Sequence, residues 1–294
     1  MTLRSMLFTP GDSQKKMDKG ASGAADALIL DLEDSVTAAR RPEARVMVRD
    51  YLTAKPDRSK QQLWVRINPL DTPDALLDLA AIMSGRPCGI ILPKVYGPAD
   101  VTTLSHYLDA LEAAFGIAAG HVKIMPVATE TAPSIFALGG YKTATTRLYG
   151  LTWGAEDIAA ALGASANRDA NGALYFTYQM ARSLCLAGTV AADVIPIETV
   201  YPDFRDLSGL EAYAIAGKRD GFRGMMAIHP DQVAIINRAF TPTDTEIAWA
   251  TRVVEAFANS SDGVVGLDGQ MLDMPHLKQA HRLLESVSHS RPAA

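Results

Sequence analysis

The chain has 294 residues, 48% of them hydrophobic, and its 28 lysines and arginines against 33 acidic residues give a net charge of −5. This length allows a large core, and the acidic balance without a basic stripe excludes nucleic acid as an expected partner. No stretch approaches the ~20 apolar residues of a membrane span, and Cys88 and Cys185 lack metal-type spacing, so we expect a soluble protein of the reducing cytoplasm.

Short apolar runs rich in β-branched residues alternate with helical patterns along the chain. Runs such as "ALILDL" and "GIILP" are continuously apolar, which is typical of parallel strands covered on both faces. We expect strands at 3–9, 27–32, 63–67, 89–93, 122–128, 148–153, 193–197 and 225–228, and helices at 42–52, 102–115, 132–138, 170–187 and 207–219. Eight such βα units in about 240 residues predict a closed (β/α)8 TIM barrel.

A doubly wound open sheet is the alternative architecture. It ordinarily carries a glycine-rich phosphate turn after its first strand. Here that strand ends in "FTPGDSQKK", which has a single glycine and a proline. The barrel is therefore preferred.

The pattern changes after the eighth strand, at "FTPTDTEI". Thr243 and Glu246 form a capping box that opens a helix through about Phe257. A glycine-containing loop or hairpin follows, and then a helix that starts near Pro275. We therefore expect a barrel at 1–240 and a helical lid extension at 241–294. We expect the tail that follows the capped helix to be too short for a core of its own, so that it packs on its own barrel or on a neighbour's.

Ionisable side chains gather where the predicted strands end. In barrels of this type the βα loops converge at the carboxyl ends of the strands, and the chemistry lies there. The residues at these positions are Asp31, Glu33, Asp34, Arg66, Lys94, Glu130, Glu156, Asp157 and His229. The sequence therefore predicts that polar groups meet at one mouth of the barrel.

Glu130 in "ATETAPSI" and Asp157 in "GAEDIAAALG" suggest a metal site. Either residue alone is explained by the start of a helix, where a carboxylate is favourable. As a pair at adjacent strand ends they repel each other unless a cation lies between them, and a hard cation with oxygen ligands is the usual solution. Because no His or Cys is near either residue, Mg²⁺ fits better than Zn²⁺, with the remaining positions left to water and substrate.

Arg66 in "WVRIN" ends a strand that should be buried, where an arginine needs an anionic partner. That partner is a substrate carboxylate, an internal acid such as Glu33 or Asp34, or both. Lys94 is either a substrate contact or a charge balance for these acids. Asp273 in "MLDMPH" is explained most simply as the N-cap of the last helix.

Other conspicuous residues have structural explanations. Arg41, Arg45 and Arg49 recur every four residues and are expected on a solvated helix face. His229 in "MAIHP" is expected to be a positioned turn histidine rather than a base. No Ser-His-Asp arrangement, G-x-S-x-G or Walker-type loop is present, which argues against nucleophilic hydrolysis and phosphoryl transfer.

An ordered set of segments across nearly the whole chain resembles the citrate lyase β-subunit-like group of CoA-ester lyases, in the HpcH/HpaI aldolase superfamily. This group includes malyl-CoA and citramalyl-CoA lyases. The segments are "RSMLFTPG", "LILDLEDSV", "VRIN", "ILPKV", "ETA", "GAEDIAAALG", "YPDFRDLSGL", "GFRGMMAIHPDQV" and "DGQMLDMPH". A single piece such as "ETA" has no weight alone, but the ordered set is specific.

The resemblance implies a (β/α)8 barrel that uses Mg²⁺ to cleave or form the C–C bond of a 3-hydroxyacyl thioester, giving a 2-keto acid and acetyl-CoA. It implies that Glu130 and Asp157 hold the metal and contact substrate, and that Arg66 contacts the reacting oxygens. Asp273 resembles the family's acid/base group, which an adjacent subunit delivers, and this replaces its explanation as a simple cap. A homotrimer or homohexamer with small-molecule acyl-CoA and keto-acid partners, and no membrane partner, is implied.

The sequence also departs from the family. Met225 and Gln270 stand where members often have Lys, and Glu198 stands where they often have Asp. The missing lysines are expected to weaken contacts to the phosphates of an acyl carrier. Three alternatives stay open: a malyl-CoA thioesterase, a metal aldolase acting on free keto acids, and a non-catalytic subunit that binds an acyl thioester. The keto acid, whether glyoxylate, pyruvate or oxaloacetate, also stays open.

Overall fold

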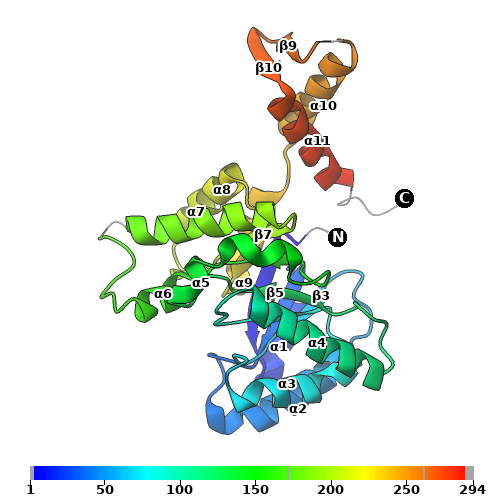
Figure 1. Ribbon diagram of the computed structural model, residues 1–294, viewed down its shortest axis with the longest axis vertical. Coiled ribbons are helices and arrows are strands. Elements are labelled where there is room, and N and C mark those ends of the chain that lie inside the picture. The colour runs from blue at the N-terminus through cyan, green and yellow to red at the C-terminus, as the bar shows by residue number, and fades with distance from the viewer. Residues whose placement is uncertain (1–2, 171, 261, 289–294) are drawn as a thin grey trace.

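The structure is a computed structural model that describes residues 3–170, 172–260 and 262–288 (Figure 1). Eight parallel strands form one sheet in the order β5-β4-β3-β2-β1-β8-β7-β6. Single parallel bridges, Ile124 to Leu148 and Val127 to Thr152, join the segments of β5 and β6 and close the ring. The predicted (β/α)8 barrel is confirmed. The strands are β1 Ser5–Pro10, β2 Ala27–Asp31, β3 Gln62–Arg66, β4 Gly89–Leu92, β5 Lys123–Pro126, β6 Gly150–Leu151, β7 Ile195–Glu198 and β8 Gly224–Ala227.

Helices lie between the strands and surround the barrel (Figure 1). The helix expected at 170–187 begins only at Phe176, because the Asp169 N–H donates to the carbonyl of Ala173 over 2.9 Å and closes a turn before it. The α-helices are α1 Gln14–Ala21, α2 Arg41–Ala54, α3 Pro73–Ile82, α4 Pro98–Ala114, α5 Ala132–Ile135, α6 Ala155–Ala161, α7 Phe176–Ala191, α8 Leu207–Asp220 and α9 Pro230–Phe240. Short 3-10 helices are η1 Ala38–Arg40, η2 Met83–Gly85 and η3 Leu138–Thr143.

The strands are continuously apolar because each one serves two cores. On β2, Ala27 and Ile29 belong to the cluster inside the barrel, whereas Leu28 and Leu30 belong to the larger cluster between strands and helices. Trp64 fills the barrel interior, and a Cβ on Gly89 of the next strand would lie 2.3 Å from its ring. A glycine is therefore required at this position.

The arginines of α2 correct one expectation. Arg45 is buried, and its Nε donates to Asp78 of α3 over 2.7 Å, while Arg41 pairs with Asp74 over 2.6 Å. A repeat of four residues places side chains on one face, but here that face packs on α3 rather than facing water. The prediction of a solvated face was wrong for these two residues.

The C-terminal segment forms an arm that stands away from the barrel (Figure 1). It consists of α10 Asp244–Ala258, the antiparallel strands β9 Val264–Leu267 and β10 Gln270–Asp273, and α11 Met274–Ser288. The predicted capping box is confirmed, since Thr243 accepts from the Glu246 N–H and its own N–H donates to the Glu246 carboxylate.

The arm has an apolar cluster of its own, in which the tail packs on α10 rather than on a barrel as expected. The apolar stripes of α10 and α11 face each other and the β9–β10 hairpin. The sequence pattern of either helix by itself does not reveal this pairing. The buried members are Ala250, Val253, Phe257, Val265, Leu272 and Ala280. The arm can therefore hold its shape without resting on a barrel.

The arm joins the barrel at the amino ends of the strands. α9 follows β8 and runs back from the mouth, ending at Phe240. Arg4, directly before β1, donates to the Thr241 hydroxyl over 3.1 Å, which fixes the start of the arm on this side. The arm thus leaves from the face opposite the barrel mouth. Within the part of the chain that the structure describes, no helix has the length and apolar character for crossing a membrane.

Candidate active site

The residues predicted at the strand ends lie at the mouth of the barrel. Asp31 and Arg66 are the last residues of β2 and β3, and Lys94 follows β4 by two positions. Glu130 lies in the loop after β5, and Asp157 lies in the first turn of α6. Ion pairs and short contacts connect these groups into one polar cluster.

Arg66 is held by two internal carboxylates. Its Nε and Nη2 donate to the two oxygens of Asp31, both over 2.7 Å, and its Nη1 lies 2.9 Å from Glu33. The guanidinium also lies 4.8 Å from the ring centroid of Phe8. The internal ion pair considered for Arg66 is present, with Asp31 as the forked partner, while Asp34 stays 3.9 Å away. Contact with a substrate stays a prediction.

This pairing changes the electrostatics of the mouth. Burial alone would raise the pKa of the Asp31 carboxyl, but the bonds from Arg66 hold that pKa below its ordinary value. Burial would likewise lower the pKa of Arg66, but Asp31 and Glu33 raise it. Arg66 is therefore a fixed positive charge at the mouth.

Lys94 has a backbone and a side-chain role. Its φ of 51° lies in the left-handed region, which directs its N–H to the Glu130 carboxylate over 2.6 Å. Its ammonium contacts Glu33 and lies 3.2 Å from Asp34 and 3.6 Å from Asp157. Of its two sequence interpretations, charge balance for the acids is the one that these contacts show.

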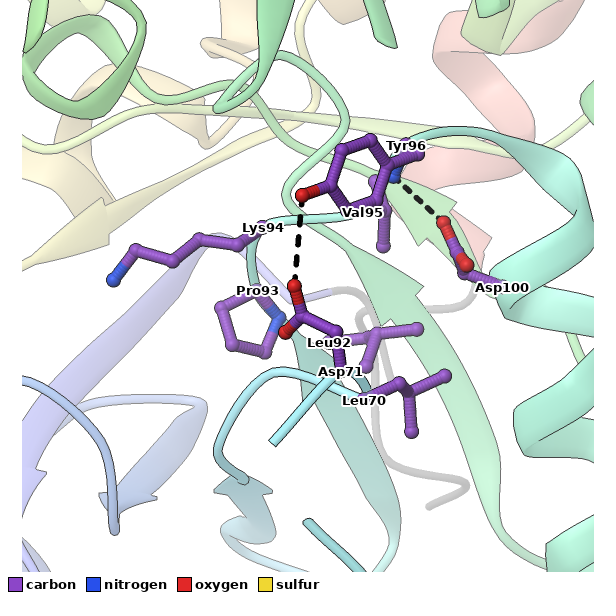
Figure 2. A pocket seen from close by; sticks show the side chains of 8 residues that line it. All are labelled: Leu70, Asp71, Leu92, Pro93, Lys94, Val95, Tyr96 and Asp100. Atoms are coloured by element: carbon purple, nitrogen blue, oxygen red, sulfur yellow. Dashed lines mark hydrogen bonds between the residues drawn. The ribbon is translucent and has the colours of Figure 1, made fainter. Parts of the chain in front are cut away.

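The β4 loop also lines a small pocket beside the mouth. Figure 2 shows the side chain of Lys94 pointing away from Tyr96, Asp71 and Asp100, which line this pocket. The Tyr96 N–H donates to Asp100 over 2.6 Å, and its hydroxyl lies 3.5 Å from Asp71. The volume of about 30 Å³ is far below the roughly 300–1,000 Å³ of ligand pockets, so this pocket is too small for a substrate.

Glu130 and Asp157 have the electrostatics of a cation site. Burial, and then the charge of Asp157, raise the pKa of Glu130 to about 8. Gly154, the N-cap of α6, lies against this side chain, since a Cβ there would be 2.9 Å from the Glu130 Cγ. Two hard oxygen donors that repel each other fit Mg²⁺. No cluster of three or more His, Cys, Asp or Glu suited to a metal occurs in the described ranges, so water and substrate would complete the coordination.

Asp273 is not brought together with the other predicted residues of its own chain. It ends β10 in the arm, where its Oδ1 lies 2.6 Å from the Nδ1 of His276, and its side chain is 53% exposed. Because the arm leaves from the opposite face, Glu130, Asp157 and Arg66 lie at the far end of the same barrel. His276 was missed in the sequence, although the D-x-x-H spacing at a helix start could have indicated it.

A buried network behind the mouth was also missed. Glu198, the last residue of β7, is fully buried and accepts from Trp153 Nε1 over 2.5 Å and from Arg182 Nε over 2.7 Å. Trp153 directly precedes Gly154, so this network supports the loop that carries Asp157. The sequence signals were an acid that closes an apolar strand and its departure from the Asp that family members often have there.

His229 behaves as predicted for a turn histidine. It is the N-cap of α9, and its Nδ1 accepts from the Asp231 N–H over 3.3 Å. Its ring stacks on Phe204 with 4.9 Å between centroids.

The chain is similar in sequence to known proteins. Residues 4–230 match the model of the family described as HpcH/HpaI aldolase/citrate lyase. The chain is 34% identical to a citrate lyase subunit beta-like protein of Mycobacterium tuberculosis, over 97% of this chain and 95% of that one. It is 31% identical to the mitochondrial citramalyl-CoA lyase of Rattus norvegicus, over 96% and 85%, and 30% identical to a (3S)-malyl-CoA thioesterase of Cereibacter sphaeroides, over 96% and 93%.

A solved structure is similar over the whole chain. The protein CitE from Mycobacterium tuberculosis, in complex with magnesium, acetoacetate and coenzyme A, superposes with a TM-score of 0.80. Its sequence is 32% identical, and the match covers 98% of each chain.

Proposed function

Because the chain belongs to the HpcH/HpaI aldolase/citrate lyase family, we propose that it is an Mg²⁺-dependent carbon–carbon lyase acting on a 3-hydroxyacyl-CoA thioester. Malyl-CoA or citramalyl-CoA is the expected type of substrate, and the reaction gives or consumes a 2-keto acid and acetyl-CoA. The observation that carries this proposal is the pair Glu130 and Asp157 beside the buried charge of Arg66. The citramalyl-CoA lyase relative and the magnesium- and CoA-bound neighbour support it.

Glu130 and Asp157 would hold the Mg²⁺ ion, and the chain already orients Glu130 for this role. The backbone N–H of Lys94 orients Glu130, and Gly154 leaves room for its side chain. When bound, the ion supplies Lewis-acid stabilisation of negative charge on the oxygens of the acid portion.

Arg66 would contact the same oxygens from the other side. Asp31 and Glu33 hold its guanidinium rigidly, so little reorganisation is needed when negative charge develops. In the cleavage direction the substrate hydroxyl loses its proton to solvent, and the carbon that bears this hydroxyl becomes the keto carbon. The bond from this carbon to the acyl α-carbon breaks, and its electron pair forms the thioester enolate.

Asp273 of a neighbouring chain would exchange the proton at the acyl α-carbon, converting the enolate to acetyl-CoA or the reverse. The arm's attachment supports delivery to another chain, because Asp273 lies far from the mouth of its own barrel. His276 would hold the carboxylate in position. The enzyme is then a closed oligomer, and a homotrimer or homohexamer is proposed.

A thioesterase is the second candidate, favoured by the malyl-CoA thioesterase relative. In that reaction the same site would position a water molecule at the thioester carbonyl. Purified protein incubated with malyl-CoA, Mg²⁺ and a thiol reagent separates the candidates. Glyoxylate with acetyl-CoA indicates a lyase, whereas free thiol with malate indicates hydrolysis. Binding without turnover of malyl-CoA or citramalyl-CoA would contradict both and leave a non-catalytic acyl-thioester-binding subunit.

A further inference from the structure

A second hollow, of about 640 Å³, lies where the arm joins the barrel. The barrel contributes the end of α8 and the turn before β8, including Arg219 and Arg223. The arm contributes Trp249 of α10 and Arg282 of α11. Because the turn before β8 is at the amino ends of the strands, this hollow is on the opposite side of the barrel from the mouth. Its volume falls in the range of small-molecule sites.

The lining is positively charged, although the chain has a net charge of −5. Lys218 pairs with Glu246, the one acidic residue of the lining, over 2.9 Å. Arg219, Arg223 and Arg282 form no side-chain hydrogen bond or ion pair with any residue that the structure describes. Guanidinium groups match phosphate oxygens in shape and charge, so three such groups around a hollow favour a phosphorylated anion.

The hollow also offers an aromatic surface. Of the three tryptophans in the chain, Trp64 and Trp153 are fully buried, whereas Trp249 is partly exposed and lines the hollow. An indole ring can stack on a planar base, and such stacking tolerates different bases. Phosphate-binding groups and a stacking ring are thus present in one cavity.

We propose that this hollow binds a nucleotide, with the phosphates on Arg219, Arg223 and Arg282 and the base against Trp249. Two sources carry this chemistry: a free nucleoside diphosphate or triphosphate, and the phosphorylated adenosine end of a CoA molecule. Because barrel and arm both line the hollow, the bound nucleotide fixes the arm relative to the barrel. The site is separate from Glu130 and Asp157, so it does not depend on the proposed lyase reaction.

The test uses the full-length protein titrated with ADP, CoA, adenosine and inorganic phosphate. Binding is followed by calorimetry and by quenching of the accessible Trp249. We expect ADP, CoA or both to bind at least about tenfold more tightly than adenosine or phosphate, since these lack one half of the ligand. Arg223→Ala and Arg282→Ala should each weaken that binding about tenfold or more. Arg238→Ala, at an exposed arginine of α9 paired with Glu211, is the matched control and should not.

The two sources are separated by competition. Because the proposed substrate also carries CoA to the mouth, only the CoA binding that ADP displaces and Arg282→Ala weakens is assigned to the hollow. ADP binding that CoA does not displace assigns a free nucleotide. Asp157→Asn should leave ADP binding unchanged, because this residue lies at the mouth. The proposal is overturned if phosphate binds as tightly as ADP, if neither ADP nor CoA binds, or if the binding is the same in both arginine variants as in the wild type.

Discussion

At the scale of single residues, the paired carboxylates give the most direct test. Glu130→Gln or Asp157→Asn should abolish turnover and weaken Mg²⁺ binding, because each removes one hard, charged oxygen ligand. Glu156→Gln is the matched control, since Glu156 is exposed in the same turn of α6 and should change neither property. Calorimetric titration with Mg²⁺ and circular dichroism separate ligand loss from misfolding. Full activity in excess chelator would contradict the metal assignment.

Arg66→Lys tests the planar fork at constant charge. A lysine lacks the planar fork that bonds the two oxygens of Asp31, so its charge is no longer held rigidly toward the substrate. The value of kcat/KM should therefore fall by one to two decades, or about 1.5–3 kcal/mol. Thermal unfolding measured on the same variant shows how much stability the ion pair contributes. An unchanged kcat/KM would leave Arg66 with a structural role only.

The residues at the mouth could be predicted from the sequence, because the carboxyl ends of the parallel strands of a barrel meet on one face. Sequence reasoning therefore brought Arg66, Glu130 and Asp157 together correctly. It could not find the bond from the Lys94 N–H to Glu130, because that bond depends on a left-handed φ at a residue that rarely adopts one. Nor could it select Asp31 rather than Asp34 as the partner of Arg66, since the choice depends on side-chain direction at the end of β2.

At the scale of elements, the junction of β6 with α6 sets the position of Glu130. Gly154→Ala should weaken Mg²⁺ binding about tenfold or more, because the new methyl group would lie 2.9 Å from the Glu130 Cγ and displace it. Gly139→Ala is the control, since no atom lies within 4 Å of its built Cβ. Equal Mg²⁺ affinity in the Gly154 and Gly139 variants would show that Glu130 adapts freely.

A buried ion pair between α4 and the start of the β6 segment predicts acid sensitivity. Glu112 accepts from Arg147 and from the N–H groups of Gly120 and Val122. Burial would raise the pKa of Glu112, but these bonds lower it below its ordinary value. Its stabilising contribution is therefore complete above the unfolded pKa, near the ordinary glutamate value, and is lost as pH falls through the lower folded pKa.

Glu112→Gln should then destabilise the protein by about 3 kcal/mol at pH 7 and flatten the acid side of the stability curve. Glu43→Gln, at an exposed glutamate of α2, is the comparison. Urea unfolding between pH 3 and 7 measures both. A parallel loss at every pH would mean that packing, rather than the charge of Glu112, is responsible.

Strands were predictable as elements because continuous apolar runs mark burial on both faces. The start of α7 was placed too early, although Gly172, with a φ of 80°, marks the turn at Asp169 that precedes the helix. The arm's own core was also missed. The apolar stripes of α10 and α11 do not show by themselves what they pack against. Val253 of α10 and Leu272 of β10 are buried because the two helices and the hairpin pack together.

At the scale of the whole molecule, the shared site predicts complementation. Asp157→Asn and Asp273→Asn are each expected to be inactive, but random mixing of equal amounts should restore about a quarter of the sites over all closed rings formed. An intact mouth from one variant then meets an intact arm from the other. Co-expression with two affinity tags isolates the mixed oligomers for assay.

The controls are the Asp157→Asn and Asp273→Asn variants, each expressed alone. Both should assemble normally and show no activity alone. If verified mixed oligomers are also inactive, the arm serves its own barrel and the shared-site model is wrong.

Because the arm is attached opposite the mouth, each chain has a mouth at one end of its barrel and an arm at the other. If the arm of one chain docks on the mouth of another, each chain gives its arm to one neighbour and receives an arm from a neighbour. Successive chains close into a ring only if the rotation from one chain to the next divides a full turn into a whole number of steps. Any other rotation gives an open filament. The bend between barrel and arm, set in part by Arg4 and Thr241, therefore decides between a finite ring and an open polymer. Dilution that breaks the ring should remove activity with a steep dependence on protein concentration, because a lone chain holds two halves of different sites.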